Sequence, residues 1–199
     1  MGDAMSRLGR VLAEIDTANA EDPNRVDIDG ESRPAELVYG ERMSEIQQQL
    51  YPDASDELAI ATRAQHLKRW IMPRSDYPMD RKGYLRWRSE LKRKHAELAG
   101  GIMEECGYSA TQIDRVGALI RKEGLKRDPE CQALEDIVCV VFLKYYFAQF
   151  AAKHDDEKLI RIVAKTWGKM SQKGHEAALA LDLEPELSRL VSKALEAGA

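Results

Sequence analysis

The sequence predicts an all-α protein that forms a single domain of about eight or nine helices. Apolar residues recur at helical spacing along most of the chain, and helix-capping residues precede several of these stretches. No stretch alternates apolar and polar residues in the way a half-buried strand does. Of the 199 residues, 44% are hydrophobic and 32% charged, which is the composition of a folded domain with its own core.

We expect three helices in the first third of the chain. The first spans roughly residues 4–20, the second opens at Pro34, and the third begins near Ser55. The polar run 21–33 contains turn residues and predicts a long loop between the first two helices.

A second loop and a long helix follow. Residues 71–82 contain two prolines and predict a loop, after which a helix starts at Gly83 or Tyr84 and ends near Cys106. The pair Gly100-Gly101 lies inside this helix, where each glycine costs about 1 kcal/mol relative to alanine. The pair therefore predicts a kink or a tight crossing with another helix.

Capping residues indicate where helices begin in the rest of the chain. Ser109 and Gln112 have the spacing of a capping box, and Asp128-Pro129 supplies an N-cap followed by proline at the first helical position. The most apolar helix follows at 130–154 and should be central, and Pro185 starts the last helix. The predicted domain thus has three parts: an N-terminal helix and loop (1–33), a core (34–154) and C-terminal helices (155–199).

We expect a cytoplasmic protein without a bound cofactor. The first twenty residues lack the apolar run of a secretory signal, and the most apolar stretch, 137–150, is interrupted by Lys144 and is too short to span a membrane. The three cysteines are odd in number and not closely spaced, so they predict neither a disulfide framework nor a zinc site.

The most informative feature is the basic segment, which we define as residues 63–95. It contains eleven lysine or arginine residues against three acidic ones, a local net charge of +8, whereas the rest of the chain carries −12. It also contains two tryptophans and two tyrosines. Arginine forks bind phosphate and aromatic faces stack on bases, so the segment predicts a pocket for an anionic ligand. The alternative is a solvated amphipathic helix with two core tryptophans.

The candidate site residues come from this segment and from two positions beyond it. The ligand-binding candidates are its cationic and aromatic residues and two later lysines: Lys68, Arg69, Trp70, Arg74, Tyr77, Arg86, Trp87, Arg88, Lys122 and Lys126. His66, His95 and Asp136 are the catalytic candidates, because histidine titrates near neutrality and a carboxylate entering an apolar helix needs a partner. We expect arginine or histidine of the basic segment to be that partner, and we predict no metal ligands.

Residues 64–67 read Ala-Gln-His-Leu, and residues 134–136 read Leu-Glu-Asp at the start of the apolar helix. This order of elements resembles the HD-type metal phosphohydrolase superfamily, in which a His-Asp pair and a later Asp bind divalent metal. Leu67 stands where the first aspartate would be, and Lys122 stands near a position often held by histidine. The resemblance therefore implies an HD-like core that has lost its metal and gained a cationic pocket.

Six motifs spread over nearly the whole chain carry a closer resemblance; they occupy residues 15–24, 64–70, 73–78, 83–88, 125–129 and 134–136. Together they resemble the bacterial and fungal family called domain of unknown function 4202, which implies an all-helical protein of about this size and no established activity. Members are sometimes labelled glutamyl-tRNA synthetase. Residues 169–173, Lys-Met-Ser-Gln-Lys, resemble the Lys-Met-Ser-Lys-Ser loop of such enzymes in their first three positions, but the sequence lacks the parallel sheet and the His-Ile-Gly-His-type signature.

Three functions remain open from the sequence. The favoured one is a module or enzyme that binds a nucleotide or another phosphorylated small molecule through the basic segment. The second is a protein associated with RNA or tRNA, whose affinity falls steeply with salt. The third is a protein-interaction module whose arginines pair with an acidic partner. The sequence leaves the ligand, catalysis and the oligomeric state open.

Overall fold

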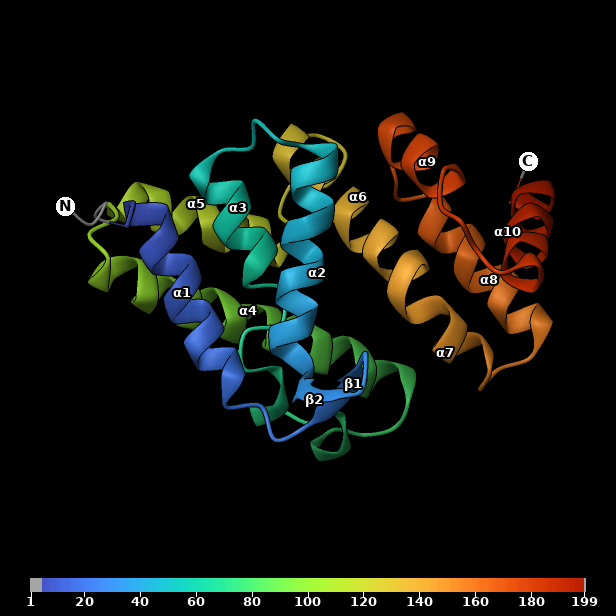
Figure 1. Ribbon diagram of the computed structural model, residues 1–199, viewed down its shortest axis with the longest axis horizontal. Coiled ribbons are helices and arrows are strands. Elements are labelled where there is room, and N and C mark those ends of the chain that lie inside the picture. Colours follow the sequence, from blue (N-terminus) through green and yellow to red (C-terminus); the bar gives the residue numbers. More distant parts are fainter. Residues whose placement is uncertain (1–4, 199) are drawn as a thin grey trace. The chain divides into compact units, whose positions relative to one another are not determined.

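The computed structural model describes residues 5–198, and it is almost entirely helical (Figure 1). These residues form two compact units. The first unit contains the described residues up to Gln48 together with Pro52–Glu123, and the second contains Gln49–Tyr51 and the residues from Gly124 onward. The parts expected from the sequence, 1–33, 34–154 and 155–199, do not coincide with these units, and the single domain stays a prediction.

The chain begins with helix α1 (Arg7–Ala20), which starts at the N-cap Ser6. A hairpin follows where we expected only a loop: β1 (Arg25–Ile28) pairs antiparallel with β2 (Glu31–Pro34). Asp29 and Gly30 both have positive φ angles, as the two-residue turns that favour Asp-Gly require. The expectation of no strand is therefore wrong here, because a turn signal that we assigned to a loop closes a short hairpin.

Helices α2 (Ala35–Leu50) and α3 (Asp56–Arg63) begin where the sequence predicts them. The Ser55 side chain caps α3 by accepting a hydrogen bond from the Leu58 amide at 3.0 Å. Two short 3₁₀ turns, Arg69–Ile71 and Arg74–Asp76, lie in the stretch between α3 and the next helix.

The first unit is completed by α4 (Arg81–Glu105) and α5 (Ala110–Arg121), which pack against each other. The Asp80 side chain caps α4, and the predicted capping box of Ser109 and Gln112 is confirmed. A Cβ atom at Gly100 would lie 3.1 Å from Cγ2 of Ile113, so this glycine permits the close crossing of α4 and α5. Helix α1 also contacts α3 and α4, and α3 contacts α5.

The second unit contains five α-helices: α6 (Pro129–Val141), α7 (Phe147–Ala151), α8 (Asp156–Trp167), α9 (Gln172–Leu179) and α10 (Pro185–Gly198). The predicted central helix is interrupted by a π-helical turn at Phe142–Tyr146. This interruption helps bring the number of α-helices in residues 5–198 to ten, instead of eight or nine. Helix α6 packs on α9, and α10 packs on α7 and α8.

Each unit has its own apolar core. Ile15, Ile60 and Leu119 are fully buried in the first unit, and Leu134 and Phe147 are fully buried in the second. In residues 5–198 no helix is both long and apolar enough to cross a membrane.

Candidate functional site

His66 and Glu36 form the polar contact around which the first unit builds its candidate site. His66 lies in the turn that follows α3, and its Nδ1 atom is 2.9 Å from Oε2 of Glu36 in the first turn of α2. The Tyr39 ring stacks on the imidazole with centroids 3.7 Å apart and planes at 9°. Glu36 and Tyr39 are three residues apart, so one face of α2 holds the histidine from two sides.

The end of α1 fixes both partners in place. Asp22 Oδ2 accepts a hydrogen bond from the Glu36 amide at 2.9 Å, so Asp22 caps α2 from a distance. Asn19 Oδ1 accepts from the Lys68 amide at 2.9 Å, next to His66. Both side chains are buried. The motif at residues 15–24 therefore positions the pair without contributing to it directly.

His95 comes from α4 and lies beneath the pair. Its Nδ1 atom donates a hydrogen bond to the Leu67 carbonyl at 2.7 Å, and its ring centroid is 6.3 Å from that of His66. The residue is 2% exposed, and its Nε2 atom is buried without a hydrogen-bond partner in residues 5–198. Burial and the neighbouring His66 lower the pKa of His95 to about 3, so the ring is neutral near pH 7.

Two cations complete the arrangement. Arg69 Nη1 lies 3.8 Å from Glu36 Oε1, and its guanidinium carbon lies 5.3 Å from the centre of the Trp87 ring. Lys122 follows α5 with a left-handed backbone. Burial, followed by the charges of Arg69 and Lys122, lowers the pKa of His66 despite the opposing effect of Glu36. We define Glu36, His66, Arg69, His95 and Lys122 as the histidine centre.

The hydrogen bonds assign the protons of this centre. A neutral histidine that donates from Nδ1 carries no proton on Nε2, so His66 and His95 both present Nε2 as an acceptor. The His66 side chain keeps 26% of its surface exposed, which leaves it accessible to a ligand. The centre can therefore accept a proton or a hydrogen bond from a ligand while two cations attract its negative charge.

Several predicted ligand-binding residues instead stabilise the stretch before α4. Arg74 donates to the carbonyls of Tyr77 and Pro78 at 2.9 and 2.7 Å. Glu90 accepts from the Tyr77 hydroxyl at 2.6 Å and from Arg86 Nε at 2.7 Å. Tyr77, Pro78, Arg86 and Glu90 line a small recess of about 280 Å³.

We expected Trp70 and Trp87 to shape a ligand pocket by stacking on a base, and the structure gives them other surroundings. Trp87 is buried and donates from Nε1 to the Met72 carbonyl at 2.9 Å, while Trp70 is half-buried in the first 3₁₀ turn. Arg88 is exposed, with Nη1 3.4 Å from the Tyr84 hydroxyl. Of these three residues, Trp87 contacts the histidine centre, through the Arg69 guanidinium that lies over its ring.

The local charge of +8 is partly neutralised in space. Arg63 forms a bidentate pair with Asp16 of α1, with both distances at 2.6 Å. Lys68 Nζ lies 2.7 Å from Glu21. Carboxylates that precede the basic segment in sequence thus pair with its first part, which a count along the chain does not detect.

Asp136 belongs to the second unit, and its hydrogen-bond donors belong to the same unit. Its two carboxylate oxygens accept four hydrogen bonds: from the Tyr51 hydroxyl at 2.8 Å, from Gln132 Nε2 at 3.2 Å, and from the Ser171 amide and hydroxyl at 2.7 and 2.5 Å. The predicted partners from the basic segment are not the observed ones. We define Tyr51, Gln132, Asp136 and Ser171 as the aspartate cluster.

Two lysines of the second unit that the sequence singles out have structural partners there. Lys169 Nζ is 3.6 Å from the buried Glu135, so the Lys-Met-Ser stretch helps to neutralise this carboxylate. Lys126 Nζ donates to the Gly168 carbonyl at 3.0 Å, next to the same stretch. Lys169 therefore links the turn that precedes α9 to α6, and Lys126 links the stretch before α6 to the end of α8.

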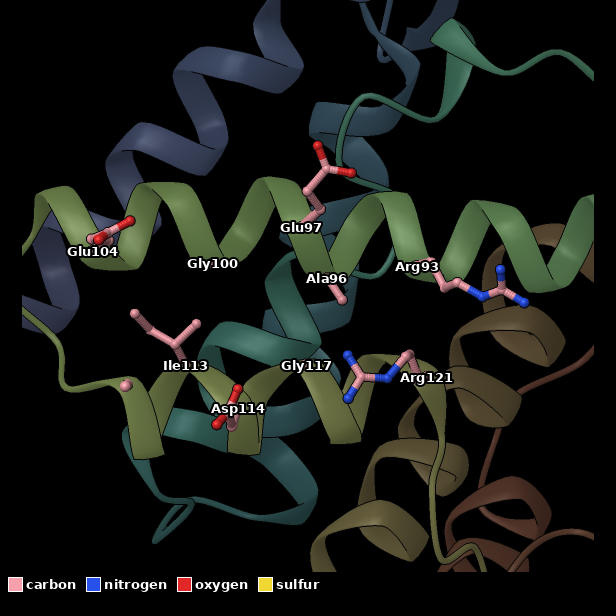
Figure 2. Close-up of a pocket in the computed structure, with 10 residues that line it drawn as sticks. Arg93, Ala96, Glu97, Gly100, Glu104, Ile113, Asp114, Gly117 and Arg121 are labelled. Atoms are coloured by element: carbon pink, nitrogen blue, oxygen red, sulfur yellow. The ribbon is translucent and has the colours of Figure 1, made fainter.

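The first unit also contains an open groove between α4 and α5, with a volume of about 450 Å³ (Figure 2). Arg93 and Arg121 lie toward one end, and Glu104 and Asp114 lie toward the other. Arg121 Nε is 2.6 Å from Glu123, so this cation already has a partner. None of the predicted site residues lines the groove, and we do not include it in the candidate site.

The described residues do not gather a set of metal ligands. Within residues 5–198 no group of three or more histidine, cysteine, aspartate or glutamate side chains is arranged to hold a metal ion. Leu67, at the position of the metal-binding aspartate in the resembling superfamily, is buried, and its carbonyl accepts from His95. The HD-like core stays a prediction.

The sequence did not identify Glu36 and Tyr39 as site residues. Both lie in the first turns of α2, where an acidic residue is usually explained by the helix dipole. The motif at 15–24 does carry a signal for the site. Its polar residues Asn19 and Asp22 are buried and accept hydrogen bonds from backbone amides next to His66 and at Glu36.

The comparisons with known proteins identify a family and nothing closer. No curated protein and no solved structure matches the chain. The model of one protein family, described as Domain of unknown function (DUF4202), matches residues 9–191. These residues include all six motifs in full, and they span both units. The chain therefore belongs to the DUF4202 family.

Proposed function

We propose that the histidine centre binds a nucleotide or another phosphorylated small molecule. The observation that carries this proposal is the buried Nε2 atom of His95, which has no hydrogen-bond partner in residues 5–198 and belongs to a ring 6.3 Å from that of His66. An unsatisfied buried polar atom costs about 1–3 kcal/mol. A ligand that donates a hydrogen bond to this atom would remove that cost on binding.

Arg69 and Lys122 are the groups that we assign to the phosphate. The distance of 3.8 Å between Arg69 and Glu36 exceeds that of a hydrogen bond, so Arg69 can turn to a ligand without losing a strong ion pair. Its fork can bind two phosphate oxygens at once. With both histidines neutral, Arg69 and Lys122 supply the positive charge that attracts an anion.

The two histidines restrict the rest of the ligand. Neutral imidazoles with bare Nε2 atoms accept hydrogen bonds, and a fully ionised phosphate has none to donate. The ligand therefore needs hydroxyl or amino groups beside its phosphate. Nucleotides and sugar phosphates carry a phosphate together with separate hydroxyl or amino donors, whereas inorganic phosphate has no donor apart from its own P–OH and nucleosides have no phosphate.

We assign to His66 the role of a general base in any reaction at this centre. Its lowered pKa keeps it neutral at pH 7, and Glu36 both orients the ring and would stabilise the cation that forms when Nε2 takes a proton. In this proposal the chain is a relative of the HD-type phosphohydrolases in which a cationic pocket stands in place of the metal ligands.

Thermal unfolding with a matched set of compounds tests the proposal. AMP and ribose 5-phosphate should raise the melting temperature more than adenosine or inorganic phosphate, because a ligand selective for the folded state stabilises it. His95→Asn keeps the donor to the Leu67 carbonyl but lacks Nε2, and Arg69→Gln lacks the fork. Each should weaken binding roughly 10- to 100-fold, the equivalent of one lost charge-assisted or buried hydrogen bond.

Arg93→Gln is the matched control, because it removes an exposed arginine of the same basic segment whose side chain contacts Ser89. It should leave the affinity unchanged. Failure of every phosphorylated compound to raise the melting temperature would contradict the proposal. Stabilisation by a short RNA alone, with a steep dependence on salt, would favour the RNA-associated alternative instead.

A further inference from the structure

An exposed apolar ridge surrounded by cations lies at the start of α4. Six large hydrophobic side chains are exposed in residues 5–198, and three of them, Met79, Tyr84 and Leu85, fall within seven residues of each other. Met79 is 80% exposed. Such concentration is unusual, because isolated exposed apolar residues are common whereas grouped ones mark interaction surfaces.

Helical spacing places cations around this ridge. Arg81, Lys82 and Arg88 stand four and three residues before Leu85 and three residues after it, so all three lie beside it on the same face. All three are exposed, and no carboxylate lies within ion-pair distance of them among the described residues. We define Met79, Arg81, Lys82, Tyr84, Leu85 and Arg88 as the basic face.

The same chain carries a second surface in which an exposed leucine lies among charged residues, and here the charges are negative. Leu179 at the end of α9 is 63% exposed, and Glu176 and Asp182 stand three residues before and after it. Residues 176–186 contain four acidic residues and no basic ones. We define Glu176, Leu179, Asp182 and Glu184 as the acidic face.

We propose that the protein associates with a second copy of itself through contact of the basic face of one copy with the acidic face of the other. Each face contains an exposed leucine with charged residues three or four positions away along the chain, and the charges of the two faces are opposite. Apolar contact supplies affinity, and charge complementarity supplies orientation and speed of encounter. In a twofold pair both contacts form at once, and otherwise the same contact builds a ring or a longer assembly.

The chemistry of the basic face favours a protein over a nucleic acid. Two of its three apolar side chains, Met79 and Leu85, are aliphatic, whereas single-stranded nucleic acids are bound chiefly by stacking on aromatic rings. The acidic face offers both an exposed apolar side chain and negative charge, which complement the apolar side chains and the positive charge of the basic face. This inference does not depend on ligand binding by the histidine centre.

Sedimentation velocity of charge-reversed variants of the full chain tests the proposal. The wild type should associate with increasing protein concentration and dissociate with increasing salt, because screening weakens contacts between exposed charges. The basic-face variant Arg81→Glu/Lys82→Glu/Arg88→Glu and the acidic-face variant Asp182→Lys/Glu184→Lys should each be monomeric alone. Mixed in equal amounts they should associate again, because one variant then has two negative faces and the other two positive ones.

Two controls separate charge from packing. Arg10→Glu/Arg25→Glu reverses two exposed arginines outside both faces and should leave the association of the wild type unchanged. Leu85→Ser keeps every charge and should weaken association through loss of the apolar contact. Circular dichroism of each variant checks that its helices remain folded.

Three outcomes would overturn the proposal. The first is a wild type that stays monomeric at its highest soluble concentration. The second is association that neither variant abolishes or that mixing fails to restore, which would place the contact elsewhere. The third is a wild type that associates only when a short RNA is present, together with a basic-face variant that does not bind this RNA, which would assign the face to nucleic acid.

Discussion

The aspartate cluster and the histidine centre use a carboxylate in opposite ways. In the aspartate cluster both oxygens of Asp136 accept two hydrogen bonds each, which fills the acceptor capacity of a carboxylate. In the histidine centre Glu36 engages His66 closely and Arg69 loosely, and the buried Nε2 atom of His95 has no partner in the described residues. One cluster is saturated, and the other keeps a buried acceptor without a hydrogen-bond partner in the described residues.

This difference predicts that substitutions in the two clusters affect different properties of the protein. A saturated cluster stabilises the fold, since each of its members would be left unsatisfied if another were removed. An unsaturated cluster lowers stability in the free protein and recovers that free energy when a ligand binds. Removing Asp136 should therefore cost stability, whereas changing the histidine centre should chiefly alter binding and pH dependence.

The largest expected effect is that of Asp136→Ala. The substitution leaves the Tyr51 hydroxyl and both Ser171 donors without their acceptor, and we expect a loss of about 3–5 kcal/mol in the free energy of unfolding. Urea denaturation measures it. Asp182→Ala, which removes an exposed carboxylate of the same unit, is the control and should change little. A loss below about 1 kcal/mol would mean that the cluster does not stabilise the fold.

A smaller effect tests the packing around the same carboxylate. A Cβ atom at Gly174 would lie 2.6 Å from Oδ1 of Asp136, so Gly174→Ala should destabilise by about 1–3 kcal/mol. Gly101→Ala is the matched opposite, because a Cβ atom there meets nothing within 4 Å inside a long helix. It should stabilise by up to about 1 kcal/mol. Equal effects of the two alanines in urea denaturation would contradict this packing.

The pH dependence of stability distinguishes the histidine centre. The folded protein holds His95 neutral down to a pKa of about 3, whereas the unfolded chain protonates it near its usual 6.5. Its contribution is therefore fully present above pH ~6.5 and declines by about 1.4 kcal/mol per pH unit below that, toward pH ~3.

His95→Asn isolates this contribution, because asparagine keeps the hydrogen bond to Leu67 and does not titrate. The difference in unfolding free energy between wild type and variant should be constant above pH ~6.5 and shift against the wild type below it. A difference that stays flat as the pH falls would show that the ring is protonated in the folded protein.

The smallest expected effect on stability is that of Arg69→Gln. Its contact with Glu36 spans 3.8 Å and its side chain is partly exposed, so the ion pair contributes less than about 1 kcal/mol. The same substitution should cost much of the affinity for AMP. A large loss of stability in urea denaturation would make Arg69 a structural residue like Asp136.

The sequence predicts the helices of this protein well because their ends are locally encoded. Ser55, Ser109 and Asp128 cap the helices that follow them, as their residue types indicate. The hairpin at residues 25–34 was missed because its strands have only four residues each and are half exposed, which leaves too short an alternation to detect. The π-helical turn at Phe142–Tyr146 has no local signal that we recognise.

The candidate site was predicted in part. The basic segment contributes His66, Arg69 and His95 to the histidine centre, and Lys122, the residue that follows α5, joins them. The counter-ion Glu36 could not be foreseen, because the pairing is set by the turn after α3 and by Asn19 and Asp22, which lie far away in sequence. Tertiary pairing likewise removed Arg63 and Lys68 from the cations available to a ligand.

The protons of the four histidines provide the most direct test of the contrast between the two units. His66 and His95 should carry the proton on Nδ1, as their bonds to Glu36 and Leu67 require. In the second unit His175 should carry it on Nε2, which is 2.9 Å from the Trp167 carbonyl, and His154 should also carry it on Nε2, because Nδ1 accepts from Lys158.

The decisive measurement is a long-range ¹H–¹⁵N correlation spectrum of the histidine rings, recorded with and without AMP at neutral pH. We expect bare Nε2 signals for His66 and His95 that shift on addition of AMP, while the signals of His154 and His175 stay in place. A proton on Nε2 of His95 in the free protein, or shifts confined to the histidines of the second unit, would contradict the account.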